Sequence, residues 1–212
     1  MESLLRLREQ IPPHVTLVAV SKTRPIEDLV EAYAAGQRDF GENRVQELLE
    51  KAPGLPADAR MHHIGHLQTN KVKALLPAVY LIHGVDSERL LAEVGRRAVE
   101  RGQDAEVLLQ VHIAQEEQKF GWDGEGLERE LEAGLTGRYA GVRVRGLMGM
   151  ATFTDDKAQI RREFRGLNGV FERHRAAHGW DVLSMGMSGD WEIAVDEGST
   201  LVRIGSAIFG GR

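Results

Sequence analysis

The chain has 212 residues, of which 42% are hydrophobic and 28% are charged, so it can bury one large core and we expect a single domain over residues 1–212. Its net charge is -5, both signs are spread along the chain, and no apolar run approaches membrane-spanning length, so we expect no nucleic-acid partner, no membrane partner, no leader and no anchor. The absence of cysteine excludes disulfides and thiolate metal sites and favours a cytoplasmic location.

Apolar runs and amphipathic stretches alternate along the chain. The first element is an amphipathic helix at about residues 2–10, where leucines alternate with charged side chains and which Pro12 and Pro13 end. From there each predicted strand except the last is followed by a helix. In chain order these elements are a strand at 17–21, a helix at 26–35, a strand at 38–40, a helix at 45–49, a strand at 60–64, a helix at 70–76, a strand at 79–83, a helix at 87–101, a strand at 106–113, a helix at 124–133, a strand at 144–148, a helix at 157–177, a strand at 181–184, a helix at 191–197 and a strand at 201–204.

Eight short strands that alternate with helices predict a parallel sheet, and eight is the number of strands that closes into a barrel. An open, doubly wound sheet is the alternative. Two observations favour the closed form: no Gly-x-Gly-x-x-Gly sequence follows the first strand, and the chain leaves no room for a second domain. We therefore predict an α/β fold, a single (β/α)8 TIM barrel, in which the N-terminal helix fills the place of the long helix that is missing after the last strand.

The first strand delivers a lysine to its carboxyl end. Alternation places Val18, Val20 and Lys22 on one face, and Pro25 opens the next helix. If the strand is buried on both faces, the Lys22 ammonium lies in a poorly solvated pocket, which lowers a lysine pKa and raises the fraction of free amine. Such an amine can form a Schiff base with a carbonyl group. A lysine at a strand end is more often a solvated terminus, so Lys22 alone is weak evidence.

Two loops near the end of the chain suit an anion. In a TIM barrel the site lies at the carboxyl ends of the strands, and phosphate often binds to the loops after strands seven and eight. After strand seven, Ser188 and Gly189 lead into a helix, so a hydroxyl, free amides and a helix N-terminus converge. After strand eight, Gly205 and Ser206 let a ligand approach the backbone closely. Each loop alone would be an ordinary turn, but together they predict a phosphate site.

A closed barrel places the first strand beside the eighth, so the lysine and the anion loops face one ligand. A ligand with an aldehyde and a phosphate fits this layout, and pyridoxal 5'-phosphate (PLP) is the commonest cofactor of that kind. A phosphorylated carbonyl substrate of a Schiff-base lyase would fit the same two features.

Five segments of the sequence closely resemble the pyridoxal phosphate homeostasis protein family, in the same order and over nearly the whole chain. These segments are Ala19-Val20-Ser21-Lys22-Thr23, Phe40-Gly41-Glu42-Asn43-Arg44-Val45-Gln46-Glu47, His62-His63-Ile64-Gly65-His66-Leu67-Gln68-Thr69-Asn70-Lys71, Ser184-Met185-Gly186-Met187-Ser188 and Val202-Arg203-Ile204-Gly205-Ser206-Ala207-Ile208-Phe209-Gly210. The resemblance implies a fold similar to the barrel domain of alanine racemase, and PLP bound as an internal aldimine without an established catalytic activity.

Carried over position by position, the resemblance implies a role for seven residues. It makes Lys22 the Schiff-base lysine, places Asn43 beside the cofactor ring and places Arg203 opposite the pyridine nitrogen. The residues that it places at the phosphate are Ser188, Gly189, Gly205 and Ser206.

The same residues argue against catalysis. A guanidinium beside the pyridine nitrogen opposes protonation of that nitrogen, and an unprotonated ring is a poorer electron sink. Racemisation needs a second acid or base, a role that the resemblance to alanine racemase gives to a tyrosine of an additional domain. The tyrosines here, Tyr33, Tyr80 and Tyr139, lie outside every motif. We therefore expect no catalytic residue.

The favoured hypothesis is a PLP-binding protein that stores, protects or delivers the cofactor to PLP-dependent apoenzymes, acting as a monomer. The alternative is an enzyme, either a PLP-dependent amino acid racemase or the Schiff-base lyase. Lys119, in the loop after strand five, is a candidate second aldehyde acceptor. We expect no metal site, because His62 and His63 lie on opposite faces of a strand and no nearby carboxylate completes a ligand set with them and His66.

Overall fold

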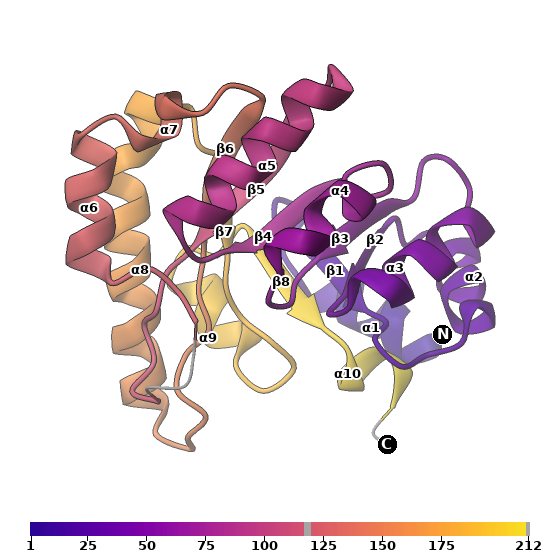
Figure 1. Ribbon diagram of the computed structural model, residues 1–212. Helices are drawn as coiled ribbons and strands as arrows, with labels where there is room; N and C mark the ends of the chain where they lie inside the picture. Colours follow the sequence, from indigo (N-terminus) through magenta and orange to yellow (C-terminus); the bar gives the residue numbers. More distant parts are fainter. Residues whose placement is uncertain (117–119, 211–212) are drawn as a thin grey trace.

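The apolar runs form eight short parallel strands, which close into a barrel (Figure 1). The computed structural model describes residues 1–116 and 120–210. Each strand pairs with the next, and β1 also pairs with β8, where Val18 lies beside Arg203 and Ala19 beside Ile204. This closure confirms the TIM barrel and excludes the open sheet. The strands are β1 (Thr16–Val20), β2 (Asp39–Glu42), β3 (Arg60–His63), β4 (Leu81–Val85), β5 (Ala105–Gln110), β6 (Val142–Met148), β7 (Val182–Ser184) and β8 (Leu201–Ile204).

The helices lie around the outside of the barrel (Figure 1). Capping residues begin and end α5: the Ser87 hydroxyl accepts a hydrogen bond from the Leu90 amide at 3.4 Å, and Gly102 follows the helix with φ +69°. The α-helices are α1 (Glu2–Gln10), α2 (Ile26–Ala34), α3 (Val45–Lys51), α4 (Val72–Leu75), α5 (Glu88–Arg101), α6 (Gly124–Glu132), α7 (Leu135–Arg138), α8 (Lys157–His178), α9 (Trp191–Asp196) and α10 (Ser206–Phe209). Two 3-10 turns are η1 (Ala52–Gly54) and η2 (Thr69–Lys71).

The predicted boundaries differ from the observed ones where strand pairing overrides the apolar pattern. β4 begins at Leu81 instead of residue 79, and β5 ends at Gln110 instead of residue 113. Beyond β5, Val111 forms only a single bridge, to Trp122, so the ladder stops there. The single-turn helices α7 and α10 have no counterpart in the predicted order, because one turn is too short to show a helical period.

The N-terminal helix occupies the predicted place. Up to residue 210, where the described part of the chain ends, the last strand is followed only by the single turn of α10, and α1 packs against α10 (Figure 1). Leu4 and Leu7 are the buried residues of α1. The expectation that α1 helps to fill the gap after β8 is therefore confirmed.

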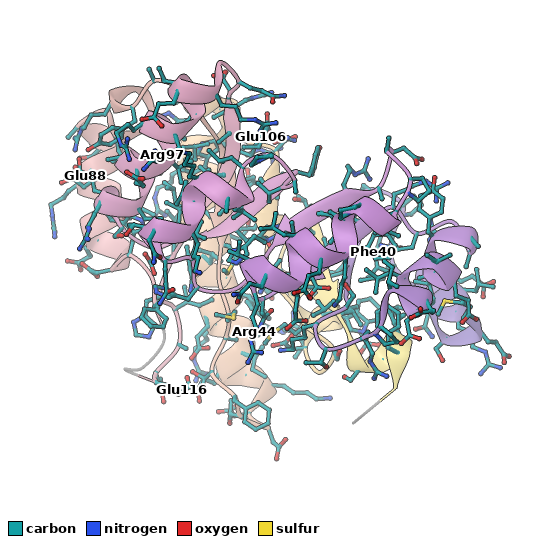
Figure 2. All side chains as sticks on the ribbon, turned by 45° about the vertical axis from the view of Figure 1, so that its right-hand side comes forward. Phe40, Arg44, Glu88, Arg97, Glu106 and Glu116 are labelled. Atoms are coloured by element: carbon teal, nitrogen blue, oxygen red, sulfur yellow. The ribbon has the colours of Figure 1, made fainter. Side chains whose placement is uncertain are left out.

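The core has two layers, one outside and one inside the barrel. The outer layer lies between the strands and the helices and includes Phe40, labelled in Figure 2, which is completely buried. The inner layer is a small apolar cluster within the barrel. Its buried members are Val18, Leu81, Leu108, Met148 and Leu201. Residues at alternate strand positions therefore face the inside, as strand geometry requires.

The strands all run toward one end of the barrel. In Figure 2, Glu106 near the start of β5 lies in the upper part of the molecule, while Glu116 in the loop after β5 lies in the lower part. No described helix is both long enough and apolar enough to cross a membrane.

Candidate functional site

The pairing of β1 with β8 places Lys22, Arg203 and Gly205 on two adjacent segments of the barrel. Arg203 lies beside Val18, Val20 is the next inward position on β1, and Lys22 follows two residues beyond the end of the strand. Gly205 lies against Val20, since a Cβ on Gly205 would come within 3.0 Å of the Val20 carbonyl oxygen. Because Gly205 has no side chain, the backbone of β1 can approach it this closely.

Lys22 is exposed, two residues beyond the end of β1. The expectation of a poorly solvated pocket around it is therefore wrong for the chain by itself. The strand ladder ends before Lys22, and the neighbouring strand continues with Gly205, which has no side chain to cover the lysine. The amine is accessible to a ligand from solvent.

The backbone before Lys22 is held by a buried ion pair on the outer face of the barrel. The Ser21 hydroxyl donates to Glu42 Oε1 at 2.6 Å, and Lys51 Nζ donates to the same oxygen at 2.8 Å and to the Ser21 carbonyl at 2.9 Å. Glu42 and Lys51 are both buried. Burial raises the pKa of Glu42, and its bonds with Lys51 and Ser21 offset part of the rise.

The backbone after Lys22 is held by Glu47. The Thr23 amide donates to Glu47 Oε2 at 2.8 Å, and Lys51 Nζ lies 3.4 Å from that oxygen. Burial raises the pKa of Glu47, but the Thr23 amide and Lys51 outweigh it, and the pKa is lowered. Thr23 has φ +63°, an uncommon value for a side chain of this kind, so these bonds hold a strained turn. Lys51 was not predicted from the sequence, where its only signal is its spacing of four from Glu47.

Arg203 lies buried inside the barrel, and its hydrogen bonds go to neutral oxygens. Its Nη1 donates to the Ser184 hydroxyl, and its Nη2 donates to the Gly149 carbonyl at 3.1 Å. Burial lowers the pKa of Arg203 to about 10, while the charge of Asp190 opposes this shift. The guanidinium is thus charged at neutral pH and can only donate hydrogen bonds.

The loops after β7 and β8 meet. The Gly205 amide donates to the Ser188 hydroxyl at 3.3 Å. Gly189 and Ser206 are exposed nearby in sequence, and Ser206 begins the turn of α10. The structure therefore brings Ser188 and Gly205 together at the end of the barrel that carries Lys22, and it leaves Gly189 and Ser206 accessible.

Asn43 follows β2 and is half-buried. Its backbone is pressed against Gly65, where a Cβ would lie 2.3 Å from the Asn43 carbonyl oxygen. Gly65 lies in turn against Gly84, where a Cβ would lie 2.4 Å from the Gly65 carbonyl oxygen. Gly65, after β3, and Gly84, within β4, thus allow the close backbone packing that positions the turn carrying Asn43.

The remaining candidates lie apart from these residues. The hydroxyl of Tyr33 donates to Asp58, and that of Tyr139 donates to Glu88 at 2.6 Å. Tyr80 lies at the opposite end of the barrel, at the start of β4, with its ring 5.4 Å from that of His62. The described residues contain no group of three or more His, Cys, Asp or Glu that could hold a metal ion. Lys119 lies outside the described residues.

Comparison with known proteins places this arrangement in a family. Residues 2–212 match the family described as alanine racemase, N-terminal domain. A pyridoxal phosphate homeostasis protein of Aquifex aeolicus is 40% identical over 199 residues, which cover 92% of this chain and 86% of that protein. PipY of Synechococcus elongatus, solved without PLP, is 40% identical, with a TM-score of 0.92 over 99% of both chains. Its structure with PLP bound gives a TM-score of 0.89.

Alanine racemase of Clostridium difficile shares the fold alone: it is 13% identical, with a TM-score of 0.79 over 99% of this chain and 56% of that one. Its additional length matches nothing in this chain. From the family match along residues 2–212 and the two relatives of 40% identity, the chain belongs to the pyridoxal phosphate homeostasis protein family, within the alanine racemase N-terminal domain fold.

Proposed function

We propose that this chain binds PLP at the carboxyl ends of its strands, with Lys22 as the covalent attachment point, and that it stores, protects or delivers the cofactor. The observation that carries the proposal is an exposed lysine just beyond β1, the strand that pairs with β8, while β8 carries Arg203 and leads into Gly205. PipY, the 40% identical relative, has a structure with PLP bound. The residues present fit PLP, because they offer an amine, a donor for the ring nitrogen and a loop pair for the phosphate.

The attachment is a condensation. The free amine of Lys22 adds to the aldehyde carbon of PLP, and a C=N bond forms as one water molecule leaves. The contacts of Ser21 with Lys51 and of Thr23 with Glu47 hold the backbone on both sides of this lysine. The chain thus supplies an amine on a fixed backbone and does not need to organise it when the ligand arrives.

The phosphate belongs at the junction of the loops after β7 and β8. The Ser188 hydroxyl and the Gly205 amide already face each other at 3.3 Å, and Gly189 and Ser206 are accessible there. Amide and hydroxyl donors of this kind suit an anion. Asn43, on the turn after β2, would contact the ring from the other side of β1.

Arg203 limits the chemistry that is available to bound PLP. When bound, PLP supplies an electron sink for carbanions, and that sink is strongest when the ring nitrogen is protonated. A buried, charged guanidinium opposes a second positive charge beside it. The hydroxyl groups of Tyr33 and Tyr139 bond elsewhere. The guanidinium and these tyrosines together favour a protein that holds PLP over one that uses it in catalysis. In this proposal the chain acts as a monomer in the cytoplasm, and PLP-dependent apoenzymes receive the cofactor.

The first test is the absorption spectrum of the purified chain titrated with PLP, for wild type, Lys22→Ala and the control Lys73→Ala. Lys73 is an exposed lysine on α4, away from the strand ends. We expect an imine band in the wild type and the control but not in Lys22→Ala, and a pyridoxyl group on Lys22 by mass spectrometry after borohydride reduction. No band in the wild type would refute PLP binding and favour a phosphorylated carbonyl substrate.

A second experiment separates a carrier from an enzyme. PLP-loaded protein is mixed with a PLP-dependent apoenzyme, and in parallel with free amino acids. Transfer of PLP without turnover is the expected result. Turnover of an amino acid at enzymatic rates, lost in Lys22→Ala, would instead make the chain a racemase.

A further inference from the structure

A chain of hydrogen bonds runs through the barrel interior from Arg203 by way of buried polar side chains. We call this chain, Arg203–Ser184–His83–His62–Asp39, the polar file. Arg203 Nη1 donates to Ser184 Oγ, which lies 3.0 Å from His83 Nδ1. His83 Nε2 lies 2.9 Å from His62 Nδ1, and His62 Nε2 lies 3.0 Å from Asp39 Oδ1. All five side chains are buried. The file links the carboxyl end of β8 to the start of β2.

Asp39 ends the file as a carboxylate. Arg60 Nε donates to Asp39 Oδ1 at 2.6 Å, and a second nitrogen of Arg60 bonds to Asp39 Oδ2. Burial raises the pKa of Asp39, but the bonds from Arg60 and His62 outweigh it, and the pKa is lowered. The file therefore begins at a group that can only donate and ends at a group that can only accept.

These two ends fix the direction of every bond between them. Because Asp39 accepts, His62 carries its proton on Nε2 and, when neutral, accepts on Nδ1. His83 must then donate from Nε2 and accept on Nδ1, and the Ser184 hydroxyl donates to it. Ser184 in turn accepts from Arg203. All protons point from Arg203 toward Asp39, and no other arrangement with neutral histidines satisfies each bond.

The competing arrangement has a charged His62 that donates from both nitrogens. Burial lowers the pKa of His62 despite Asp39, with Arg60 adding to the effect and the ring of Tyr80 packed against it. Burial also lowers the pKa of His83 well below its usual value, and so do the charges of His62, Arg203 and His63. A positive charge on either buried histidine is thus disfavoured, and the neutral file is selected.

We propose that Ser184, His83, His62 and Asp39 are positioning residues for Arg203: their one-directional file fixes the guanidinium fork so that its remaining N–H groups are presented to the ring nitrogen of PLP. This inference rests on the proposed function. The apolar cluster shows that the barrel interior can be filled without polar groups. A buried polar file costs more to desolvate than an apolar filling, so its retention here is explained by the orientation of Arg203.

The proton positions are tested on the full chain without any ligand. Nitrogen-15 NMR of histidine-labelled protein distinguishes protonated from unprotonated ring nitrogens, and His62→Gln and His83→Gln variants give the assignments. We expect one tautomer for both rings, with protons on Nε2 only, from about pH 6 to 8. A proton on Nδ1 of either ring, or a doubly protonated His62, would overturn the one-directional file.

The effect on the ligand is tested with a matched pair of buried serines. Ser184→Ala removes one of the two acceptors of Arg203 and leaves the Gly149 carbonyl, whereas Ser199→Ala removes a hydroxyl that bonds only to the backbone carbonyls of Leu183, Met185 and Leu201 among the described residues. A hydrogen bond to a charged group is worth enough that PLP binding should weaken about tenfold or more in Ser184→Ala. Equal binding by the two variants would show that the file does not position Arg203.

A second matched pair of variants tests the Asp39 end of the file. Asp39→Asn alters the final acceptor, while Asp181→Asn alters an exposed carboxylate that Arg145 binds at the same end of the barrel. Coupling along a chain of bonds predicts about 2- to 30-fold weaker PLP binding in Asp39→Asn only. Wild-type binding in a folded Asp39→Asn would remove Asp39 from the proposal. If the wild type binds no PLP, the proposed function fails while the NMR result still decides the file.

Discussion

Lys51 is the residue on which the backbone beside Lys22 depends. It bonds to Glu42, to the Ser21 carbonyl and, more loosely, to Glu47. Lys51→Met keeps the length of the side chain but leaves the buried Glu42 without a cation. Breaking a buried pair in this way should cost about 3–5 kcal/mol, measured by urea unfolding at pH 7. Lys73→Met, on an exposed side chain, is the control and should change stability by less than about 0.5 kcal/mol.

The same variant has a pH signature. Burial already raises the pKa of Glu42, so its folded state binds a proton more readily than its unfolded state. Stability therefore falls as pH rises above the unfolded value, and removal of Lys51 strengthens this trend. The loss caused by Lys51→Met should be smaller at pH 5 than at pH 7, because a neutral Glu42 needs no cation. A loss independent of pH would show that packing, not charge, is responsible.

His63 is the second buried group with a defined pH dependence. Neither of its ring nitrogens has a hydrogen-bond partner among the described residues. Burial lowers its pKa to about 4, and the charge of His66 acts in the same direction. An unfolded histidine has a pKa of about 6.5, so the unfolded chain binds more protons between these values and stability falls as pH drops from about 6.5 to 4.

His63→Phe should therefore stabilise the chain, and more so in acid. Removing the two unsatisfied ring nitrogens should raise the free energy of unfolding by about 1–3 kcal/mol at pH 7.5, with the phenylalanine ring in the place of the imidazole. At pH 5 the gain should be larger by about 2 kcal/mol, since the variant no longer loses stability by protonation of the unfolded chain. Thermal unfolding at the two pH values measures this, with the exposed His14→Phe as control. An equal gain at both values would contradict the lowered pKa.

At the scale of elements, the turns at the strand ends depend on glycines without room for a side chain. Gly65→Ala would place a Cβ 2.3 Å from the Asn43 carbonyl oxygen, so the turn after β2 must move. We expect a loss of about 1–3 kcal/mol in urea unfolding, together with weaker PLP binding because Asn43 is displaced. Gly166→Ala, within α8 and with nothing within 4 Å, should instead stabilise by about 0.5–1 kcal/mol.

The elements were predictable where a local signal defines them. Ser87 and Gly102 bound α5 because capping chemistry is local, and the alternation in β1 put Val18 inside the barrel. The buried networks were not predictable in this way. Lys51 and Ser21 lie 30 residues apart, as do many pairs that never meet, and only the pairing of strands brings them together.

The polar file shows the same limit. The alternation of β3 and β4 put His62 and His83 on defined faces, but the register that pairs His62 with Leu81, two residues before His83, is a property of the closed sheet. The expected desolvation of Lys22 failed for a related reason. The prediction assumed that the burial of β1 continues to Lys22. Lys22 lies beyond the last paired residue of β1, and the adjacent segment after β8 begins with Gly205, which has no side chain.

For the whole molecule, the proposed site lies across the seam that closes the barrel. Lys22 follows β1 and Arg203, Gly205 and Ser206 belong to or follow β8, so one PLP molecule would join the first strand to the last. Seven of the eight strand pairs connect neighbours in sequence, while the eighth joins β1 to β8, the first strand to the last. A ligand at this position should therefore stabilise the closure of the barrel as a whole.

At a free PLP concentration one hundred times Kd, mass action adds about 2.7 kcal/mol, which corresponds to a rise in Tm of roughly 5–10 °C for a chain of this size. Because the ligand joins β1 to β8, the gain in amide protection measured by hydrogen exchange should be greatest in these two strands and smallest in α5 and α6 on the far side of the ring. Pyridoxal, which lacks the phosphate, should attach to Lys22 but give a smaller rise, since it holds only the β1 side of the seam. Lys22→Ala with PLP should likewise lose most of the rise. A protection gain spread evenly over the strands would mean that the ligand stabilises the fold without bridging its closure.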